Sequence, residues 1–459
     1  MRRIHSEKVR GTFYSSDATD VERQLRQWSE DLPCYLDGVH MLFVPHAGYV
    51  YSGKVATHAY RQLANRCFRR IFILADNHRR EWTDRGVAIP NFDDFQIFDR
   101  RIPIDQTFCE DLLDKFPNVF SPTEEAYNGH TIEAQLPVLL HFADISDSIM
   151  VPLIFQGTSE EERRMLAKYL HSRCGDEDLI VISSDLSHYL PAQAAEIKDR
   201  ETLAVLLRGQ FPIGENCLCG MEALSCACHI AVSRHWICHF VDYAHSGMAV
   251  GEMSRVVGYG ALAWTQKAIY FSSDVFIALE TLVLQCIEYS LARLPPPNVD
   301  ILLAQFPQLC AHQSVFVTLM KNERLRGCIG GLGDFSRTIL DGVQQRATDA
   351  AFRDFRFHPV TPEELPQLKA HVSILSFPTE LHLPGDQWIG YLCDTHPKPG
   401  VILEFNGRTS TFLPEVWEQV PNPRDFLAAL CNKQGAPGDA WKSPTAKLLT
   451  YTTQTWRAP

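Results

Sequence analysis

The chain has 459 residues, 45% of them hydrophobic and 21% charged, a composition typical of a globular protein. Its formal net charge of −12 argues against binding to duplex nucleic acid, which requires basic patches. No window approaches the ~18 consecutive apolar residues of a membrane span, and the polar start MRRIHSE predicts no signal peptide. The 14 cysteines, spread over a long chain, are typical of reduced thiols and predict a cytoplasmic protein.

The first stretch that contains candidate functional residues is VPHAGYVYSG at residues 44–53. The apolar run at residues 41–44 is typical of a buried parallel strand, and Pro45 ends it because proline cannot donate to a sheet ladder. His46 is therefore expected at the carboxyl end of the strand, the edge of an open α/β sheet where ligands bind. We take Tyr49, in the same stretch, as a candidate substrate-binding residue, and expect a helix after Gly53.

A second apolar strand, residues 71–74, runs into His78 in the same way. Two imidazoles that follow two adjacent strands can converge on one point, and imidazole suits iron, zinc or copper. The pattern therefore predicts His46 and His78 as metal ligands. The alternative is that each ring only hydrogen-bonds to loop carbonyls.

The stretch NGHTIEAQLP at residues 128–137 places His130 and Glu133 three residues apart, on one face of a short helix. A position near a helix amino terminus favours a bound anion, or a carboxylate that orients an imidazole. The alternative is an ordinary capping arrangement on a solvated first turn.

Residues 179–182 form another apolar strand that runs into SSDLSH at residues 183–188. Asp185 and His188 can pair there, and a positioned histidine is the usual general acid or base. One alternative is a helix cap. Another is a hydrolase with Ser184 as its nucleophile, although the G-x-S-x-G elbow of such enzymes is absent.

The stretch CLCGMEALSCACH at residues 217–229 is rich in cysteine, but its C-x-C spacing is not the usual zinc pairing. Residues 220–236 also have the pattern of a helix rich in small residues, in which cysteine is a common core residue. We therefore expect these cysteines to be structural.

Further apolar strands alternate with helical patterns up to residue 264, which predicts a mainly parallel sheet flanked by helices in a domain at residues 1–267. A helix from residue 272 then opens a second unit, and the triple proline at residues 295–297 follows it. The mixed pattern that follows predicts a smaller α+β domain at residues 268–459. Within it, LRGCIGGL at residues 325–332 is interpreted as a glycine-bracketed turn.

Cys328 is the residue of chemical interest in that turn, because Arg326 lies two positions away and a nearby guanidinium favours the thiolate form. A reactive, catalytic thiol is therefore one interpretation. The alternative is a small buried residue in a tight β connection.

Taken together, the motifs of the first half resemble the Memo-like family. They are VPHAGYVYSG, the His78 loop, NGHTIE, SSDLSH and, at residues 254–259, SRVVGY. The second half is similar to an AMMECR-type domain, through LRGCIG at residues 325–330, AAFRDFRF at 350–357, HVSILS at 371–376 and FLPEV at 412–416. Both halves in one chain resemble the AmmeMemoRadiSam arrangement, which implies a radical S-adenosylmethionine protein as a partner.

The Memo-like fold is similar to that of the class III extradiol, non-haem iron dioxygenases. The resemblance implies a metal at His46 and His78, with iron (Fe2+) preferred and copper or zinc as other options. It implies acid–base catalysis by His188, with residues that orient the site or bind substrate at the following positions: Asp185, His130 and Glu133. The animal member takes its third ligand from a cysteine after the penultimate strand. Here that loop is His245-Ser246-Gly247-Met248-Ala249, so His245, Glu252 or water is the expected third ligand.

These expectations favour a metal-dependent redox enzyme that acts, with a radical S-adenosylmethionine partner, on a small-molecule or peptide-borne substrate. A peptide- or protein-binding module that uses the same residues without turnover is the alternative. A metal-assisted hydrolase is a third reading.

Overall fold

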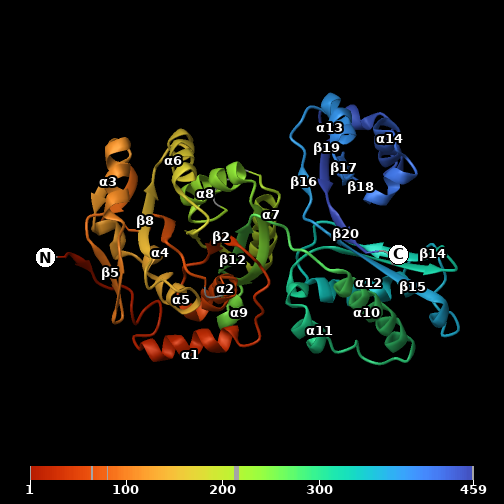
Figure 1. Cartoon of the computed structure of the whole chain (residues 1–459), viewed down its shortest axis with the longest axis horizontal. Helices are drawn as coiled ribbons and strands as arrows, with labels where there is room; N and C mark the ends of the chain where they lie inside the picture. Colours follow the sequence, from red (N-terminus) through yellow and green to blue (C-terminus); the bar gives the residue numbers. More distant parts are fainter. Residues whose placement is uncertain (1, 64–65, 80, 211–216, 457–459) are drawn as a thin grey trace. The chain divides into compact units, whose positions relative to one another are not determined.

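The computed structural model describes residues 2–63, 66–79, 81–210 and 217–456. The chain divides into two compact units, Met1–Ile269 and Tyr270–Pro459, and each is described by itself (Figure 1). The boundary expected from the sequence was residue 267.

The first unit is built on a large sheet whose strands, within the described residues, are β2 (Val39–Val44), β3 (Arg70–Asp76), β4 (Gly86–Pro90), β7 (Phe120–Thr123), β8 (Ile149–Gln156), β9 (Asp178–Ser183), β10 (His188–Leu190), β11 (Ile237–His245) and β12 (Val256–Thr265). Their order is β10-β12-β2-β9-β3-β8-β4-β7, and β11 also pairs with β12. A separate small sheet joins β1 (Ile4–His5), β5 (Asp94–Ile97) and β6 (Arg100–Pro103).

The centre of the large sheet is parallel, and its margins are not. Strands β2, β9, β3 and β8 run parallel to one another, and every residue of β2 and β9 is buried. Strands buried on both faces have continuous apolar sequences, which is why the sequence reveals them. Antiparallel pairing appears where β12 joins β2, where β10 and β11 join β12, and where β4 joins β8. The expected mainly parallel sheet is thus a mixed sheet with a parallel centre.

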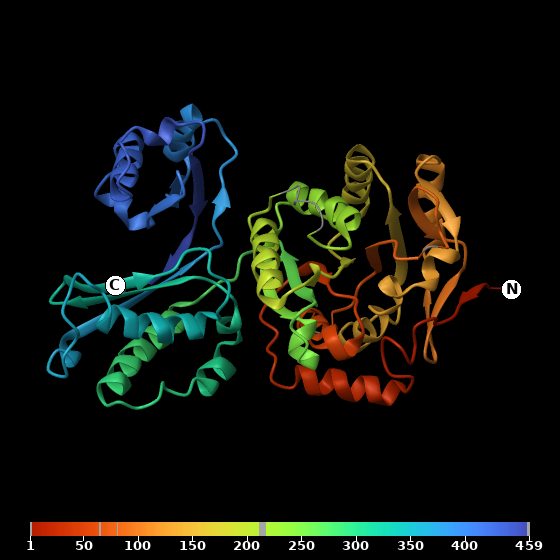
Figure 2. The same cartoon turned by 180° about the vertical axis from the view of Figure 1, so that it is seen from behind.

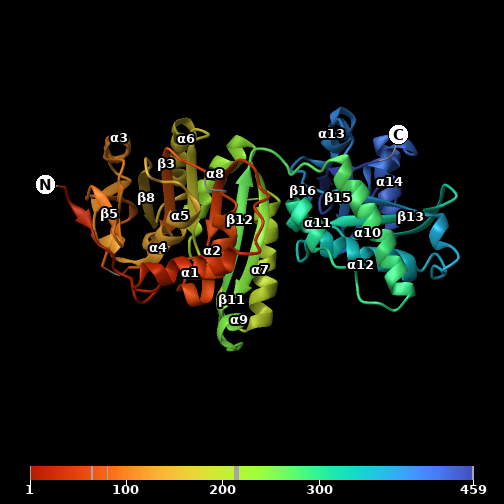
Figure 3. The ribbon, with the colours of Figure 1, turned by 60° about the horizontal axis from the view of Figure 1, so that its bottom comes forward.

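Helices cover both faces of this sheet (Figure 1). The helices of the unit are α1 (Ala18–Ser29), α2 (Tyr49–Arg61), α3 (Gln106–Lys115), α4 (His130–Glu133), α5 (Leu136–Phe142), α6 (Glu160–Arg173), α7 (Ala192–Leu207), α8 (Met221–Arg234) and α9 (Ser246–Val250). Helices α1, α2 and α5 pack together, and α2 lies on β2, β11 and β12. Helices α6 and α8 pack together, and α8 lies on β3, β8 and β9. Helix α7 runs alongside β12 (Figure 3).

Helix α2 begins before Gly53, whereas the sequence suggested a start after it. Gly53 lies inside the helix because α1 packs closely there: a Cβ at this position would come within 2.6 Å of the Trp28 ring. The glycine therefore serves helix packing, and His46 is followed almost directly by a helix.

The second unit contains two antiparallel sheets, seen from opposite sides in Figures 1 and 2. The first has the order β14-β13-β15-β20 and the second the order β16-β19-β17-β18. The strands are β13 (Val315–Lys321), β14 (Arg324–Gly330), β15 (Leu368–Leu375), β16 (Thr379–Glu380), β17 (Gly400–Phe405), β18 (Arg408–Phe412), β19 (Lys447–Tyr451) and β20 (Thr453–Thr455). The helices are α10 (Ser273–Leu291), α11 (Asp300–Gln305), α12 (Ile339–Phe352), α13 (Trp388–Asp394) and α14 (Pro423–Lys433). This is the α+β unit expected from the sequence.

The interpretation of residues 325–332 as a turn is wrong for most of the segment, because residues up to Gly330 form strand β14. The glycines serve close packing instead of a turn. A Cβ on Gly327 would overlap the carbonyl oxygen of Ala350 in α12, and one on Gly330 would overlap the Phe316 ring. Cys328 therefore lies within a strand.

None of the helices in the described part of the chain is long and apolar enough to span a bilayer. All fourteen cysteines lie among the described residues, and none of them forms a disulfide.

Gly86, the first residue of β4, is a position where we expect any side chain to be costly. Its φ of +123° is one that L-residues rarely adopt, and a Cβ would overlap the carbonyl oxygen of Val119. We expect Gly86→Ala to lower the free energy of unfolding by about 3 kcal/mol, from strain and overlap together. Urea denaturation followed by tryptophan fluorescence measures this. Gly175→Ala, with no atom within 4 Å of the added Cβ, should stay within about 0.5 kcal/mol of the parent. Equal effects of the two changes would contradict the packing argument.

Candidate metal centre

His46 follows β2 directly, and its ring is fixed in one orientation. The backbone N–H of His46 donates to Asp185 Oδ1 at 2.8 Å, and the ring Nδ1 lies 3.0 Å from Ser183 Oγ. The Ser183 hydroxyl already donates to the carbonyl of Thr131, so it accepts from His46 Nδ1–H. The neutral ring of His46 therefore carries its free lone pair on Nε2.

His78 and His188 are held by the same device. His78 Nδ1 donates to the carbonyl of Asp76 at 3.0 Å, and His188 Nδ1 donates to the carbonyl of Leu186 at 2.9 Å. A carbonyl can only accept, so in both rings Nδ1 bears the proton and Nε2 the lone pair. Backbone partners of this kind commonly orient metal-binding histidines.

The rings of His46 and His78 lie 5.0 Å apart, centre to centre. His188 is close enough to both for its charge to lower their pKa values. The structure thus brings together the three histidines that the strand ends had suggested.

Cys219 completes the cluster, and the sequence analysis missed it. Its Sγ lies 3.3 Å from His46 Nε2, and the donor atoms of His46, His78 and Cys219 all lie within 4.8 Å of one another. A tetrahedral metal bound at usual N and S distances would separate its ligand atoms by roughly 3.5 Å. Two imidazole nitrogens and one sulfur fit a transition metal in both their chemistry and their spacing.

The topology explains why Cys219 reaches this edge. Strand β11 is antiparallel to β12, which is antiparallel to β2, so β11 runs parallel to β2. Helix α8 precedes β11 and packs on the parallel strands β3 and β9. It returns against the strand direction, so its amino end lies at their carboxyl ends. Cys219 stands two residues before α8 begins.

Three contacts pin the amino end of α8. The Asp76 carboxylate accepts from the N–H groups of Glu222 and Ala223, at 3.0 and 2.8 Å. The N–H of Gly220 donates to Ser184 Oγ at 2.8 Å. The Gly220 backbone is pressed so closely against Ser184 that a Cβ would lie 2.6 Å from the Ser184 Cβ. These contacts fix the position of Cys219, because it directly precedes Gly220.

The rings of the cluster are uncharged near neutral pH. Burial lowers the pKa of His46 well below the usual imidazole value, and the neighbouring His78, His130 and His188 lower it further. Burial also lowers the pKa values of His78 and His188, and that of His130 to about 4. Neutral rings keep their lone pairs free for a metal or a proton.

The two acidic groups of the site are also affected by burial. It raises the pKa of the Asp185 carboxyl to about 7, an effect that the N–H groups of His46 and Ala47 partly offset. It also raises the pKa of the Cys219 thiol, so binding of a metal at Sγ would displace the thiol proton. Asp185 positions the backbone of His46, and its Oδ2 lies 4.0 Å from His46 Nε2.

His130 borders the cluster, with its ring 5.1 Å from His46 and 5.5 Å from His78. Phe13 stacks on it at 4.4 Å, which places a hydrophobic ring beside the cluster. His130 thus lies where a substrate-binding residue is expected, although its nitrogens are outside the compact donor group.

The side chains of Glu133 and Tyr49, which the sequence suggested as substrate-binding residues, form hydrogen bonds to other segments of the protein. Glu133 is fully buried and accepts from the N–H groups of Lys8 and Val9 and from the Tyr14 hydroxyl. It anchors the amino-terminal segment and does not orient His130. Tyr49 is 5% exposed, and its hydroxyl donates to the carbonyl of Ala134. Helical spacing and motif membership identify such residues but do not reveal which distant groups they bind.

The suggested third ligands are engaged elsewhere. His245 is buried, with Nε2 3.4 Å from Glu196, and Glu252 accepts from the N–H of Ser254. Among the described residues, the third donor atom beside those of His46 and His78 is the sulfur of Cys219. A signal existed in the sequence: C-x-C-G before a helix. Its spacing does not fit a zinc motif of its own, and nothing local in the sequence links one of its cysteines to histidines that follow other strands.

Ser184 is unsuited to the nucleophilic role considered for it. Its side chain is fully buried, accepts from Gly220 N–H and donates to the carbonyl of Asp185. A serine with its hydroxyl used in this way supports the backbone. Cys328 belongs to the second unit.

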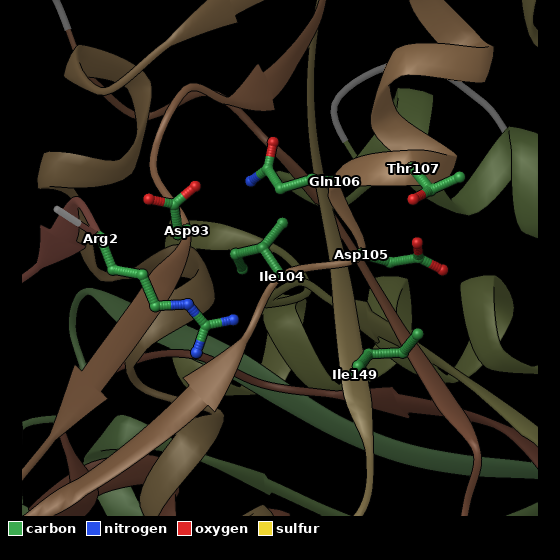
Figure 4. Close-up of a pocket in the computed structure, with 7 residues that line it drawn as sticks. All are labelled: Arg2, Asp93, Ile104, Asp105, Gln106, Thr107 and Ile149. Carbon is green, nitrogen blue, oxygen red and sulfur yellow. The ribbon is translucent and has the colours of Figure 1, made fainter.

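A surface cavity of about 450 Å³ opens elsewhere in the first unit, and Figure 4 shows its seven lining residues. Ile149 is the first residue of β8 and Gln106 the first of α3, so this cavity lies at the amino ends of the strands. The lining residues are Arg2, Asp93, Ile104, Asp105, Gln106, Thr107 and Ile149, and none is a histidine or cysteine. It is therefore separate from the His46 cluster at the opposite edge.

The first unit is thus a mixed α/β fold that gathers histidine and cysteine side chains, which are donors suited to transition metals, at the carboxyl edge of its sheet. A family model described as "Memo-like protein" matches residues 5–263, more than half of the chain, and one described as AMMECR1 matches residues 281–456. The chain therefore belongs to the Memo-like protein family and carries an AMMECR1 domain after its Memo-like unit.

Curated relatives cover the first part of the chain. A "MEMO1 family protein" of Aquifex aeolicus is 28% identical over 278 residues, 56% of this chain and 97% of the relative. One from Sulfurisphaera tokodaii is 30% identical and covers 55% of this chain and 95% of the relative.

Among solved structures, an uncharacterized protein from Pyrococcus horikoshii is similar at 27% identity with a TM-score of 0.37, covering 40% of this chain and 92% of that one. An uncharacterized protein from Escherichia coli K12 is similar at 13% identity with a TM-score of 0.34, covering 49% of this chain and 99% of that one.

The close approach at Gly220 leads to a prediction about metal affinity. We expect Gly220→Ala to push the amino end of α8 away from Ser184, because the added Cβ has no space. Displacing Cys219 in this way should weaken cobalt binding at least tenfold, about 1.4 kcal/mol. Titration followed by the sulfur-to-cobalt charge-transfer band measures the effect. Gly175→Ala should bind cobalt like the parent protein, and unchanged binding by Gly220→Ala would show that this contact does not position the thiol.

Proposed function

We propose that the Memo-like unit is a metal-dependent redox enzyme in which His46, His78 and Cys219 hold the metal. The supporting observation is the gathering of their donor atoms within 4.8 Å of one another. They lie at the carboxyl edge of a sheet with a parallel centre, where active sites of α/β proteins occur. A redox-active metal bound there would supply electron transfer and oxygen chemistry.

Iron is the metal that the extradiol-like resemblance favours. The thiolate of Cys219 is a softer donor than a carboxylate, so the same residues also suit copper or zinc. Bound zinc would favour the alternative function, a metal-assisted hydrolase, because zinc has no redox chemistry. The choice of metal therefore separates the two enzyme classes.

In the proposed enzyme His188 moves the proton. Its Nδ1 is occupied by the Leu186 carbonyl, so Nε2 is the atom that can accept a proton from a bound substrate and return it. The lowered pKa keeps the ring neutral and ready to act as a base at pH 7. Asp185 holds the backbone of His46 and acts through it, and His130 borders the space beside the metal ligands.

The proposed substrate is a small molecule or a side chain carried on a peptide, and the proposed partner is a radical S-adenosylmethionine protein. The partner rests on the union of a Memo-like unit and an AMMECR1 domain in one chain, the arrangement that the sequence resembles. Co-purification with such a protein encoded beside this one tests the proposal, and repeated failure with reconstituted iron–sulfur clusters would count against it.

A binding module without turnover is the second candidate. Large apolar side chains next to the site residues in sequence are exposed: Val50 by 68%, Tyr51 by 41% and Tyr189 by 63%. Arg255 stacks over the Tyr189 ring at 5.1 Å, which places a cation beside that ring. Exposed apolar groups of this kind often mark a surface that binds a partner. Partner capture that is unaffected by removal of the metal would favour this candidate.

Metal content tests the proposal most directly. We expect the purified protein, loaded anaerobically with Fe2+, to hold one equivalent. His46→Ala, His78→Ala and Cys219→Ala should each lose at least 100-fold in affinity, because each removes one of three protein ligands. Elemental analysis with a competing chelator measures this. The matched control is Glu252→Gln. It alters an exposed carboxylate that the sequence offers as an alternative third ligand, and it should retain the metal. Retention of the metal by Cys219→Ala, or its loss from Glu252→Gln, would overturn the ligand set.

A separate experiment addresses His188. We expect His188→Gln to keep its metal but to consume oxygen 10²- to 10⁴-fold more slowly with any substrate that the parent turns over, because it lacks the proton acceptor. An oxygen electrode and a panel of small aromatic and peptide substrates provide the measurement. His382→Gln changes a side chain that is 68% exposed in the second unit, and it should behave like the parent. Equal rates in the two variants would remove His188 from the mechanism.

A further inference from the structure

Strand β14 presents Cys328 on the face of its sheet that points away from the helices. In the neighbouring strand β13, Val315, Val317 and Leu319 are buried, and Val315 packs against Gly342 of α12. The alternate residues Phe316 and Thr318 therefore lie on the other face. Phe316 pairs with Gly330 and Thr318 with Cys328, so these four residues share that face, which we call the thiol face.

The thiol face is turned toward the second sheet of the same unit. Phe316 packs against a buried cluster formed by Leu375, Ile402, Leu449 and Tyr451, of which Ile402 lies in β17 and the last two in β19. The Thr318 hydroxyl donates to Cys328 Sγ at 3.3 Å. The thiol therefore lies beside the junction of the two sheets, and Cys328 as a residue is only partly buried.

A pair of charged residues clamps the backbone of Cys328. Its N–H donates to Asp354 Oδ2 at 2.9 Å, and its carbonyl accepts from Arg356 Nη2 at 3.0 Å. Arg356 also binds Asp354 through two hydrogen bonds, at 2.9 and 2.6 Å. These contacts hold a guanidinium beside the thiol, with 43% of the Arg356 side chain exposed. Phe355, between the two clamping residues, is 95% exposed.

A second cation comes from the last residue of α14. The Lys433 ammonium donates to the carbonyl of Thr411 at 2.7 Å and lies 4.8 Å from the centre of the Phe412 ring. It is near enough to Arg356 and Cys328 to interact with both, and burial together with the Arg356 charge lowers its pKa. Two cations from separate elements therefore lie near Cys328, and of the two only Arg356 is paired with a carboxylate, that of Asp354. An anion between them would relieve their repulsion.

We propose that the thiol face, Arg356 and Lys433 form a second site, in the AMMECR1 domain, which binds a small molecule bearing a carboxylate or phosphate and presents Cys328 Sγ to it as a nucleophile. The two cations select the negative charge, and the exposed Phe355 ring is available to an apolar part of the ligand. The proposal is independent of the metal centre of the other unit.

Charge-selective alkylation of the full-length protein tests it, with iodoacetate as the anionic probe and iodoacetamide as the neutral one. In both reactions the Cys328 sulfur forms a bond to carbon, the carbon–iodine bond breaks, iodide leaves with the electron pair, and the thiol proton passes to the buffer. Mass spectrometry of the Cys328 peptide gives each rate at low ionic strength. We expect the iodoacetate-to-iodoacetamide rate ratio to exceed that of a short neutral cysteine peptide at least fivefold. Inorganic phosphate should lower it more than sodium chloride of equal ionic strength.

Variants distinguish a built site from general attraction. Lys433→Gln should lower the rate ratio at Cys328 at least threefold, and Lys433→Arg should restore it. Lys442→Gln, a matched change at a lysine that lies over Trp441 of the same unit, should leave it unchanged. A ratio equal to that of the free peptide, a ratio insensitive to Lys433→Gln, or a Cys328 inert to both reagents would each overturn the proposal.

Discussion

The contact between the amino end of α8 and the end of β9 is the constraint on which the candidate metal centre depends. Gly220 allows the backbone of α8 to approach Ser184, and Asp76 and Ser184 accept the first N–H groups of that segment. Unpaired N–H groups at a helix start favour a nearby carboxylate, and the partly buried Asp76 provides one. The result is a thiol placed 3.3 Å from an imidazole that is 173 residues away in the sequence.

The histidine rings of the site are kept uncharged by their surroundings. Each of His46, His78 and His188 donates its Nδ1 proton to an oxygen of the protein and leaves Nε2 free. Several imidazoles so close together cannot all be protonated, since like charges and burial both oppose it. The Nε2 lone pairs of the cluster are therefore free of protons, and part of the His78 residue reaches solvent.

The candidate site residues of the two units lie at different places in their sheets. In the Memo-like unit His46 and His78 follow the ends of parallel strands, whereas Cys219 precedes a helix, and the three side chains converge at the carboxyl edge of the sheet. In the AMMECR1 domain Cys328 lies within an antiparallel strand, and its neighbours come from a loop and from a helix end. Glycine has the same role in both: Gly220 and Gly327 each remove a Cβ where one backbone must approach another segment closely.

The sequence by itself determined the strands that carry the site and the three histidines at their ends. This was possible because a strand buried on both faces has a continuous apolar run, and its end is marked by local polar residues and proline. It identified neither Cys219 as the partner of His46 nor Glu133 and Tyr49 as interior anchors, and it took β14 for a turn. Those features depend on contacts between distant segments, which the direction of α8 and the packing against α12 decide. Local periodicity records how a residue is buried, but only the tertiary structure decides what it is buried against.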